Sequence, residues 1–292
     1  MRVTAAAFRM LAAAGIAIGL AATTLVVAPA ASAAPSGYQV VTAQASVSAG
    51  GYLQQIVHCP AGKVPLNGGV QSSSAVADDS TRLEGSAPKA LAGGADIGWE
   101  VALHNEAGAF RTYTLYAVCI GWPSGYQLTA AVTTLSAHST SSLNAACPAG
   151  KVLLGGGVAL TGVSVGDHNI AIVSDSAGNG WIADLRNDEG SPLSSVVWAV
   201  CGNLPGVYAG QGYLWNKYQV GQVIFGHPTL SVTLSCPNGQ TAVGGGAWTD
   251  PQTNIRIMTS APAPGANGWT VTVRNYDWFL IHEIIIDAFC VP

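Results

Sequence analysis

The sequence has few charged residues. Lys, Arg, Asp and Glu make up 9% of its 292 residues, against about 25% in a typical soluble domain. The net charge is -4 and no cluster of Lys or Arg occurs, so we expect no nucleic-acid partner. Gly, Ala, Ser and Thr take the place of the charges, while Val, Ile, Leu and Trp recur regularly. This composition is typical of an extracellular β-protein and disfavours disorder.

Long apolar runs are missing after residue 33. Before it, Arg2 and Arg9 precede the apolar run Leu11–Val27, and Ala31-Ser32-Ala33 has the small residues of a cleavage site. Residues 1–33 are therefore predicted to be a signal peptide, and the mature chain to be secreted and extracellular without a membrane span. The alternative is an uncleaved anchor, since the run approaches spanning length; Pro29 disfavours it.

Motifs for metals and hydrolysis are also missing. No C-x-x-C, C-x-x-H or H-E-x-x-H occurs, and His282-Glu283 lacks a second histidine. Residues 162–166 match G-x-S-x-G, but no helical pattern follows, as a nucleophile elbow requires. The adjacent carboxylates Asp188 and Glu189 are poorly spaced for glycoside cleavage. We therefore predict no cofactor and no enzymatic activity.

The sequence does contain a unit that occurs three times, which has to be recognised before any fold is assigned. A Cys-Pro-x-Gly motif followed by a glycine cluster starts at Cys59, Cys147 and Cys236. Each copy is followed by a strand that ends in a second cysteine. The predicted repeats are residues 36–120, 125–202 and 213–292.

Six cysteines in three repeats allow 15 pairings, of which the simplest places one disulfide in each repeat. Loops of this length would stabilise each repeat by about 4 kcal/mol. The predicted pairs are Cys59–Cys119, Cys147–Cys201 and Cys236–Cys290.

Alternation with a period of two predicts β-strands. Leu230, Val232 and Leu234 alternate with hydroxyl residues, as in a half-buried strand. The predicted fold is all-β, with three tandem, disulfide-stapled, antiparallel β-sandwich-like repeats that pack together because their linkers are short. The alternative is a single pseudo-three-fold β-prism or barrel in which Trp99, Trp181 and Trp269 meet in a common core.

Three local features recur in every repeat. We interpret the glycine cluster as a strand where side chains would collide with a neighbouring backbone or with the repeat's own tryptophan, because a phosphate loop needs a helix after it. We expect the Cys-Pro-x-Gly turn to place proline second and glycine fourth. Asn105, Asn187 and Asn275 are expected to adopt the left-handed conformation in hairpin turns.

The loop after each glycine cluster differs most between repeats, and variable loops on a constant scaffold commonly carry binding function. An aromatic run near residue 278 could stack on a sugar ring. The carboxylates suit a polar ligand or, as an alternative, calcium. The candidate ligand-binding residues are Asp78, Asp79, Asp167, His168, Asp250 and Trp278.

The Cys-Pro-x-Gly blocks with their closing Ala-Val-Cys strands resemble repeat-bearing secreted proteins of high-GC Gram-positive bacteria. That resemblance implies export and no particular activity. The repeated turn and closing cysteine also resemble the vitelline membrane outer layer proteins, which implies a β-prism. We expect a secreted, non-catalytic binding or envelope-associated protein for glycans or other polar surface ligands, with cell-envelope polysaccharide or another extracellular protein as partner. The alternatives are a structural extracellular protein and a secreted hydrolase or hydrolase inhibitor.

Overall fold

The computed structural model describes residues 34–73, 81–90, 97–161, 168–174, 179–188, 190–203, 216–225, 229–237, 240–249, 255–276 and 281–291. The predicted signal peptide lies outside these residues. In the described parts the regular structure is strand, apart from the short 3-10 helix η2 (Pro264–Ala266), which confirms the all-β prediction. None of the described helical segments has the length and apolar character to cross a bilayer.

Each repeat contributes six strands to the described structure. Repeat 1 contains β1 (Gln39–Val47), β2 (Tyr52–His58), β3 (Lys63–Ser72), β4 (Thr81–Ala90), β5 (Ile97–Asn105) and β6 (Arg111–Gly121). Repeat 2 contains β7 (Ser124–Leu135), β8 (Ser139–Ala146), β9 (Val152–Thr161), β10 (His168–Ser174), β11 (Gly180–Asn187) and β12 (Leu193–Asn203). Repeat 3 contains β13 (Asn216–Phe225), β14 (Thr229–Ser235), β15 (Thr241–Thr249), β16 (Ile255–Pro262), β17 (Gly268–Asn275) and β18 (Ile281–Val291).

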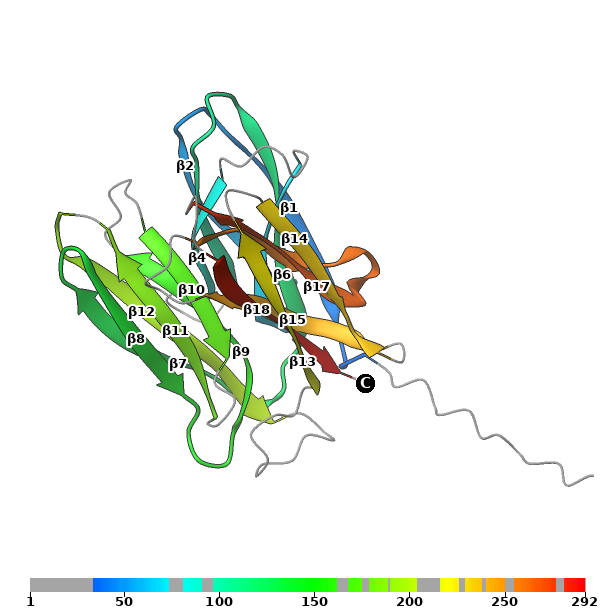
Figure 1. Cartoon of the computed structure of the whole chain (residues 1–292). Helices are drawn as coiled ribbons and strands as arrows, with labels where there is room; N and C mark the ends of the chain where they lie inside the picture. Colours follow the sequence, from blue (N-terminus) through cyan, green and yellow to red (C-terminus); the bar gives the residue numbers. More distant parts are fainter. Residues whose placement is uncertain are drawn as a thin grey trace, which may run out of the picture. The chain divides into compact units, whose positions relative to one another are not determined.

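The six strands of a repeat form two antiparallel layers (Figure 1). The first layer has its sixth strand in the middle, in the orders β1-β6-β3, β7-β12-β9 and β13-β18-β15. The second layer has its fifth strand in the middle, in the orders β2-β5-β4, β8-β11-β10 and β14-β17-β16. Apolar side chains on alternate positions of both layers fill the space between them, as in a sandwich.

One disulfide joins the two layers of each repeat. The first cysteine directly follows the second strand, and the second cysteine lies in the sixth strand, in the other layer. The predicted pairing is confirmed, and the bridges close segments of 60, 54 and 54 residues. The pairs are Cys59–Cys119, Cys147–Cys201 and Cys236–Cys290.

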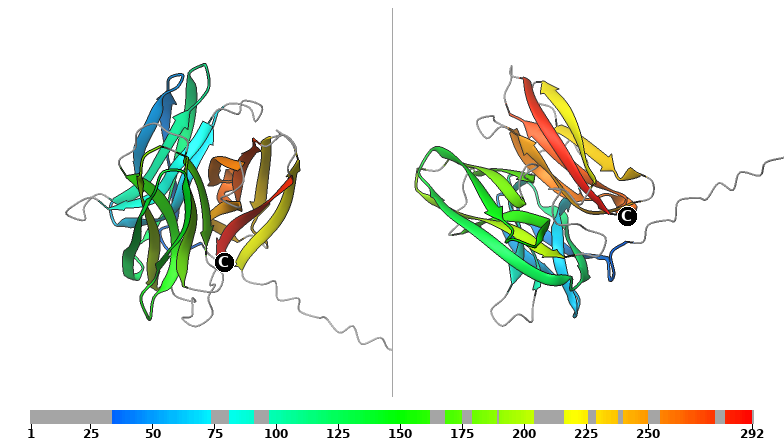
Figure 2. Two further views of the ribbon diagram at one scale, coloured as in Figure 1. Left: turned by 60° about the vertical axis from the view of Figure 1, so that its left-hand side comes forward. Right: turned by 90° about the horizontal axis from the view of Figure 1, so that it is seen from below.

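Strands of different repeats also pair (Figure 2). β3 lies against β16, with Val70 opposite Ser260, and β4 lies against β9, with Ser86 opposite Val158. Two six-stranded sheets result, with the orders β1-β6-β3-β16-β17-β14 and β2-β5-β4-β9-β12-β7. β10 and β15, from repeats 2 and 3, lie beside each other at the edges of two three-stranded sheets. The repeats are thus sandwich-like, as predicted, and adjoining repeats are joined through shared sheets.

The glycine cluster lies where strands of different layers and repeats meet. Its middle glycine lies under the repeat's own tryptophan, and a Cβ there would lie 2.3 to 2.4 Å from the indole ring. Its last glycine faces the neighbouring repeat: a Cβ on Gly69 would lie 1.8 Å from the Ser260 carbonyl oxygen, and one on Gly157 would lie 2.0 Å from that of Ser86. The predicted scaffold role is confirmed, because no side chain fits at these contacts.

The three tryptophans are buried in two hydrophobic cores. Trp99 and Trp269 belong to one core, which continues from repeat 1 into repeat 3. Trp181 belongs to a second core, which is built mainly by repeat 2 and also includes residues of repeats 1 and 3, such as Leu66 and Phe289. The Trp181 ring lies 5.7 Å from that of Phe289. The common core of three tryptophans, expected for the prism alternative, is therefore divided.

The turn after the first cysteine differs from the prediction by one residue. The Lys63 and Lys151 amides donate to the carbonyl oxygens of Pro60 and Pro148, so proline is the first residue of the turn. The glycine is the third residue, with φ of 78° at Gly62. Glycine is suited to this place because it adopts positive φ without steric cost.

The asparagines at the ends of β5, β11 and β17 are buried, and the predicted left-handed conformation is wrong. Among the described non-glycine residues only His138 and Ala266 have positive φ. The Asn105 amide nitrogen instead donates to three carbonyl oxygens, those of Val47, Ser48 and Ala109, at 2.9 to 3.1 Å. It therefore ties the β1–β2 turn to the β5–β6 turn.

Replacing Asn105 by alanine is expected to lower the free energy of unfolding by about 3 kcal/mol, because several buried carbonyl oxygens lose their donor. The exposed Asn144 provides the matched control, and its alanine variant should remain within about 0.5 kcal/mol of the wild type. Denaturant unfolding measures both. Equal stability of the two variants would contradict a structural role for the Asn105 amide.

Candidate functional site

The loops predicted to bind a ligand lead into β4, β10 and β16, and these three strands pack against one another. His168 is the first residue of β10, and its side chain lies outside the described part of the chain. The other candidate residues lie outside the described residues altogether: Asp78, Asp79, Asp167, Asp250 and Trp278. Their ligand-binding role stays a prediction.

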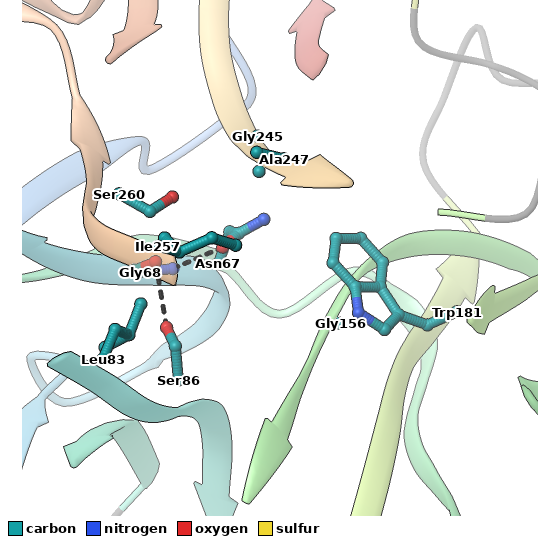
Figure 3. A pocket seen from close by; sticks show the side chains of 11 residues that line it. Asn67, Gly68, Leu83, Ser86, Gly156, Trp181, Gly245, Ala247, Ile257 and Ser260 are labelled. Carbon is teal, nitrogen blue, oxygen red and sulfur yellow. Dashed lines mark hydrogen bonds between the residues drawn. The ribbon is translucent and has the colours of Figure 1, made fainter. Parts of the chain in front are cut away.

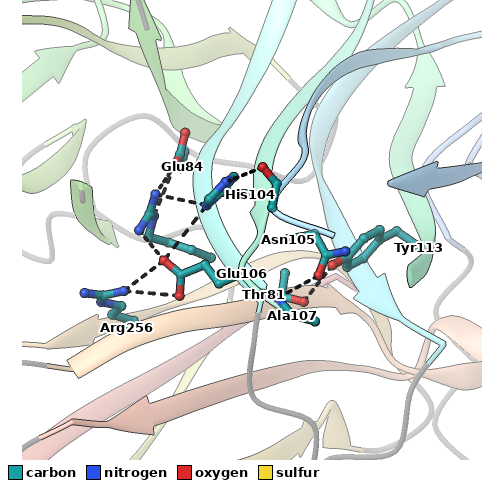
Figure 4. Close-up of polar contacts among 10 residues, drawn as sticks. Thr81, Glu84, His104, Asn105, Glu106, Ala107, Tyr113 and Arg256 are labelled. Atoms are coloured by element: carbon teal, nitrogen blue, oxygen red, sulfur yellow. Dashed lines mark hydrogen bonds and ion pairs between the residues drawn. The ribbon is translucent and has the colours of Figure 1, made fainter. Parts of the chain in front are cut away.

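A group of charged side chains lies near the beginning of β4 and β16 and the end of β5 (Figure 4). We call it the Arg–Glu cluster, and it consists of Arg82 and Glu84 on β4, His104 on β5, Glu106 after β5, and Arg256 on β16. Sequence reasoning missed it, because its members are scattered over two repeats. The only available signal was the recurrence of a charged or aromatic residue on either side of each buried asparagine.

Glu106 bridges two repeats in this cluster. Arg82 donates to Glu84 Oε1 from Nε (3.0 Å) and from Nη2 (2.7 Å), and its Nη1 donates to Glu106 Oε1. From repeat 3, Arg256 Nη1 donates to both oxygens of Glu106, at 3.2 and 3.4 Å. The His104 ring donates from Nε2 to the Gly50 carbonyl oxygen (3.1 Å), and its Nδ1 lies 3.4 Å from Arg82 Nη2.

The interior of the cluster is shielded from water. Arg82 is 2% exposed and Glu84 is fully buried, whereas Glu106 retains 25% side-chain exposure. Removing two charges from water costs several kcal/mol, which close pairing has to offset. The pairing of Arg82 with two carboxylates therefore holds β4 and the turn after β5 in one arrangement.

Tyr52 extends the cluster toward the edge of the sheet. In the register of β2, β5 and β4, Tyr52 lies beside His104, which lies beside Arg82. The Tyr52 hydroxyl and Glu84 Oε2 are buried and have no hydrogen-bond partner in the described structure. Burial, followed by the negative charges of Glu84 and Glu100, raises the pKa of Tyr52 to about 12. Tyr52 is therefore a neutral donor at physiological pH.

The same positions in the other repeats carry different chemistry. In repeat 2, Arg186 Nε donates to Asp188 at 2.5 Å. In repeat 3, the guanidinium carbons of Arg256 and Arg274 lie 4.6 and 4.9 Å from the centre of the Tyr276 ring, within cation–π range. The residue after each buried asparagine thus contacts a guanidinium in all three repeats, as a carboxylate in repeats 1 and 2 and as an aromatic ring in repeat 3.

The contacts of the Arg–Glu cluster favour positioning over proton transfer. Both Glu84 and Glu106 bind the same guanidinium, and the buried Glu84 offers no access for a substrate. Cleavage by paired carboxylates requires two groups on opposite sides of a scissile bond. We therefore assign the cluster a structural role at the junction of repeats 1 and 3.

The outward face of the sheet β1-β6-β3-β16-β17-β14 is a second candidate. Gln44, Thr114 and Gln71 are neighbours across β1, β6 and β3, and Thr272 and Ser231 are neighbours across β17 and β14. Tyr116, Thr233 and Thr270 lie in the next row. We call these eight side chains the polar face: Gln44, Gln71, Thr114, Tyr116, Ser231, Thr233, Thr270 and Thr272.

The two halves of the polar face belong to different repeats and meet at the junction of β3 and β16. The register at this junction is the single pair of Val70 with Ser260. Thr259 is 7% exposed and pairs in register with Thr272. The polar face therefore consists of two patches of amide and hydroxyl side chains, one on each side of this junction.

Hydrogen bonds order these side chains. Gln44 Nε2 donates to Thr114 Oγ1 at 2.9 Å, and the Tyr116 hydroxyl donates to Gln71 Oε1 at 3.0 Å. In the other half, the Thr233 and Thr270 hydroxyls lie 2.8 Å apart, and Thr272 donates to Ser231 at 3.1 Å. Tyr116 is half-buried and pairs across the strands with Gly69, the last glycine of the cluster. The result is an ordered, uncharged surface with one aromatic ring.

In the part of the chain that the structure describes, no group of three or more His, Cys, Asp or Glu side chains lies close enough together to hold a metal ion. The fold and the polar face define a disulfide-stapled, all-β repeat protein with an uncharged polar sheet surface. No protein-family model matches the chain, and no curated protein sequence is significantly similar to it.

Proposed function

We propose that the protein is a secreted, non-catalytic binding protein whose polar face holds uncharged glycans of a cell envelope. The observation that carries the proposal is the pair of hydrogen-bonded amide and hydroxyl patches on either side of the β3–β16 junction, with Tyr116 in one of them. Hydroxyl and amide groups can exchange hydrogen bonds with sugar hydroxyls, and an aromatic ring can stack on the apolar face of a sugar.

Charge supports an uncharged ligand. The polar face has no Asp, Glu, Lys or Arg, so an anionic polymer gains little there from charge pairing. Arg256 and Arg274 lie at one end of it and are already engaged with Glu106 and Tyr276. Secretion is proposed on residues 1–33 and on three disulfides, which persist in oxidising compartments.

A polysaccharide pull-down tests the proposal. We expect the mature chain to be retained by an insoluble neutral glucan or mannan, and the double substitution Tyr116→Ala with Gln71→Ala to weaken retention at least about tenfold, which corresponds to 1.4 kcal/mol. Phe110→Ala removes another exposed aromatic, in the β5–β6 turn, and should bind like the wild type.

Two outcomes would redirect the proposal. Retention that is unchanged in the double variant but abolished by a calcium chelator would favour the loops with Asp78, Asp79, Asp167 and Asp250 over the polar face. Absence of retention on every neutral polysaccharide would contradict glycan binding by the polar face.

A further inference from the structure

A small cavity lies where the three repeats meet (Figure 3). Its volume of about 10 Å³ is close to the space that one water molecule occupies. Side chains and backbone of all three repeats line it. The lining includes Asn67, Ser86, Gly156, Trp181, Gly245 and Ser260.

The three tryptophan indoles differ in their hydrogen-bond partners. Trp99 Nε1 donates to Ser86 Oγ at 2.7 Å, and Trp269 Nε1 donates to Ser260 Oγ at 2.8 Å. Trp181 is 1% exposed, and its Nε1 has no partner in the described structure. The buried indole of repeat 2 is therefore a donor without an acceptor.

The strand register explains why repeat 2 differs. In repeat 1, Ser86 lies opposite Val101, two residues after Trp99. In repeat 3, Ser260 lies opposite Val271, two residues after Trp269. At the same place in repeat 2, Ile172 lies opposite Ala183. Isoleucine has no hydroxyl, so the acceptor that the other two indoles use is missing from that position.

Asn67 provides a second buried donor beside the cavity. It occupies the position of Gly155 and Gly244 in the other repeats, and it is 2% exposed. Its Oδ1 accepts a hydrogen bond from the Gly68 amide at 2.7 Å, which orients the side-chain amide. Nδ2 has no partner in the described structure, and it lies 2.4 Å from where a Cβ on Gly244 would be. The side chain fits only because Gly244 has none.

We propose that one ordered water molecule occupies this cavity and accepts hydrogen bonds from Trp181 Nε1 and Asn67 Nδ2. A water oxygen accepts two hydrogen bonds, which satisfies both donors, and the water's own protons can reach oxygens of the lining such as Ser260 Oγ. Buried polar groups without partners are rare in folded proteins, and small polar cavities are commonly hydrated. The water replaces the serine hydroxyl that repeat 2 lacks, and Asn67 is the residue that holds it.

Crystallography and NMR on the mature wild-type chain test this proposal. We expect density for one water within about 3.2 Å of both nitrogens. In solution, the Trp181 Hε1 signal should show a cross-peak to a long-lived water. Trp99 and Trp269 donate to the hydroxyls of Ser86 and Ser260, which line the same cavity, so the Trp181 signal is the one that reports directly on the water. A dry cavity, or a direct bond from Trp181 Nε1 to a protein oxygen, would overturn the proposal.

A substitution adds a second readout. Asn67→Leu keeps the approximate volume but removes one donor, so the water cross-peak of Trp181 Hε1 should be lost. Unchanged Hε1 signals of Trp99 and Trp269 would show that the variant is folded, and Asn144→Leu provides the exposed control. A cross-peak that survives in the folded Asn67→Leu variant would refute the role of Asn67. The wild-type measurements decide the proposal even where that variant does not fold.

Discussion

Replacing Gly157 by alanine is expected to lower the free energy of unfolding by about 3 kcal/mol or more, at the upper end of the usual cost of overpacking. The new methyl group would lie 2.0 Å from the Ser86 carbonyl oxygen and 2.9 Å from Ala87 Cα, both backbone atoms of the adjoining repeat. Backbone atoms in a sheet cannot rotate away. β4 and β9 would have to separate, and the six-stranded sheet that joins repeats 1 and 2 would lose its central contact.

Gly108 is the matched control, because it lies in the β5–β6 turn without a positive φ, and a Cβ added to it would have no atom within 4 Å. Gly108→Ala should change the free energy of unfolding by no more than about 0.5 kcal/mol. Chemical denaturation followed by tryptophan fluorescence measures both variants. A Gly157→Ala protein as stable as Gly108→Ala would show that the contact between these repeats is loose.

Removing the disulfide of repeat 2 is expected to cost about 4 kcal/mol, the chain-entropy value for a closed segment of this length. The segment between Cys147 and Cys201 spans 54 residues. The variant Cys147→Ala with Cys201→Ala should unfold at lower denaturant concentration than the oxidised wild type. Repeat 2 should be affected first, because its second layer, β10-β11-β8, forms a three-stranded sheet of its own.

The reduced wild type serves as the reference for this experiment. It loses all three bridges and should be less stable than the double alanine variant, which keeps Cys59–Cys119 and Cys236–Cys290. If the double variant and the oxidised wild type unfold at the same denaturant concentration, the bridge contributes nothing to stability.

Features that depend on spacing within one repeat could be predicted from the sequence. The alternation of Leu230, Val232 and Leu234 identified a strand, because side chains of a strand point alternately to two faces. The disulfides followed from two cysteines per repeat. The glycine cluster was interpreted correctly, since strands on both sides of it left no helix for a phosphate loop.

Features that depend on distant segments were missed or misplaced. Asn105 has the sequence position of a turn residue, but its amide serves the β1–β2 turn, with separations along the chain of 58 and 57 residues to Val47 and Ser48. The Arg–Glu cluster joins Glu106 to Arg256, which are 150 residues apart. Local patterns carry no information about such partners.

The polar face also combines a feature that the sequence pattern shows with one that depends on the pairing of distant strands. Its hydroxyl residues are visible in the sequence as the polar half of alternating strands, such as Ser231 and Thr233 on β14. Their combination with Gln44, Gln71 and Tyr116 of repeat 1 depends on the pairing of β3 with β16. Sequence reasoning therefore directed attention to the variable loops and not to a surface that two repeats share.

By itself, the sequence determined three β-repeats, one disulfide in each, and glycines where no side chain fits. These properties follow from periodicity and composition within about 80 residues. Only the tertiary structure decided which strands of different repeats pair, because that depends on how closely glycine-lined backbones of separate repeats approach. The same contacts decided that Asn67 and Trp181 line one cavity and that the two halves of the polar face lie in one six-stranded sheet.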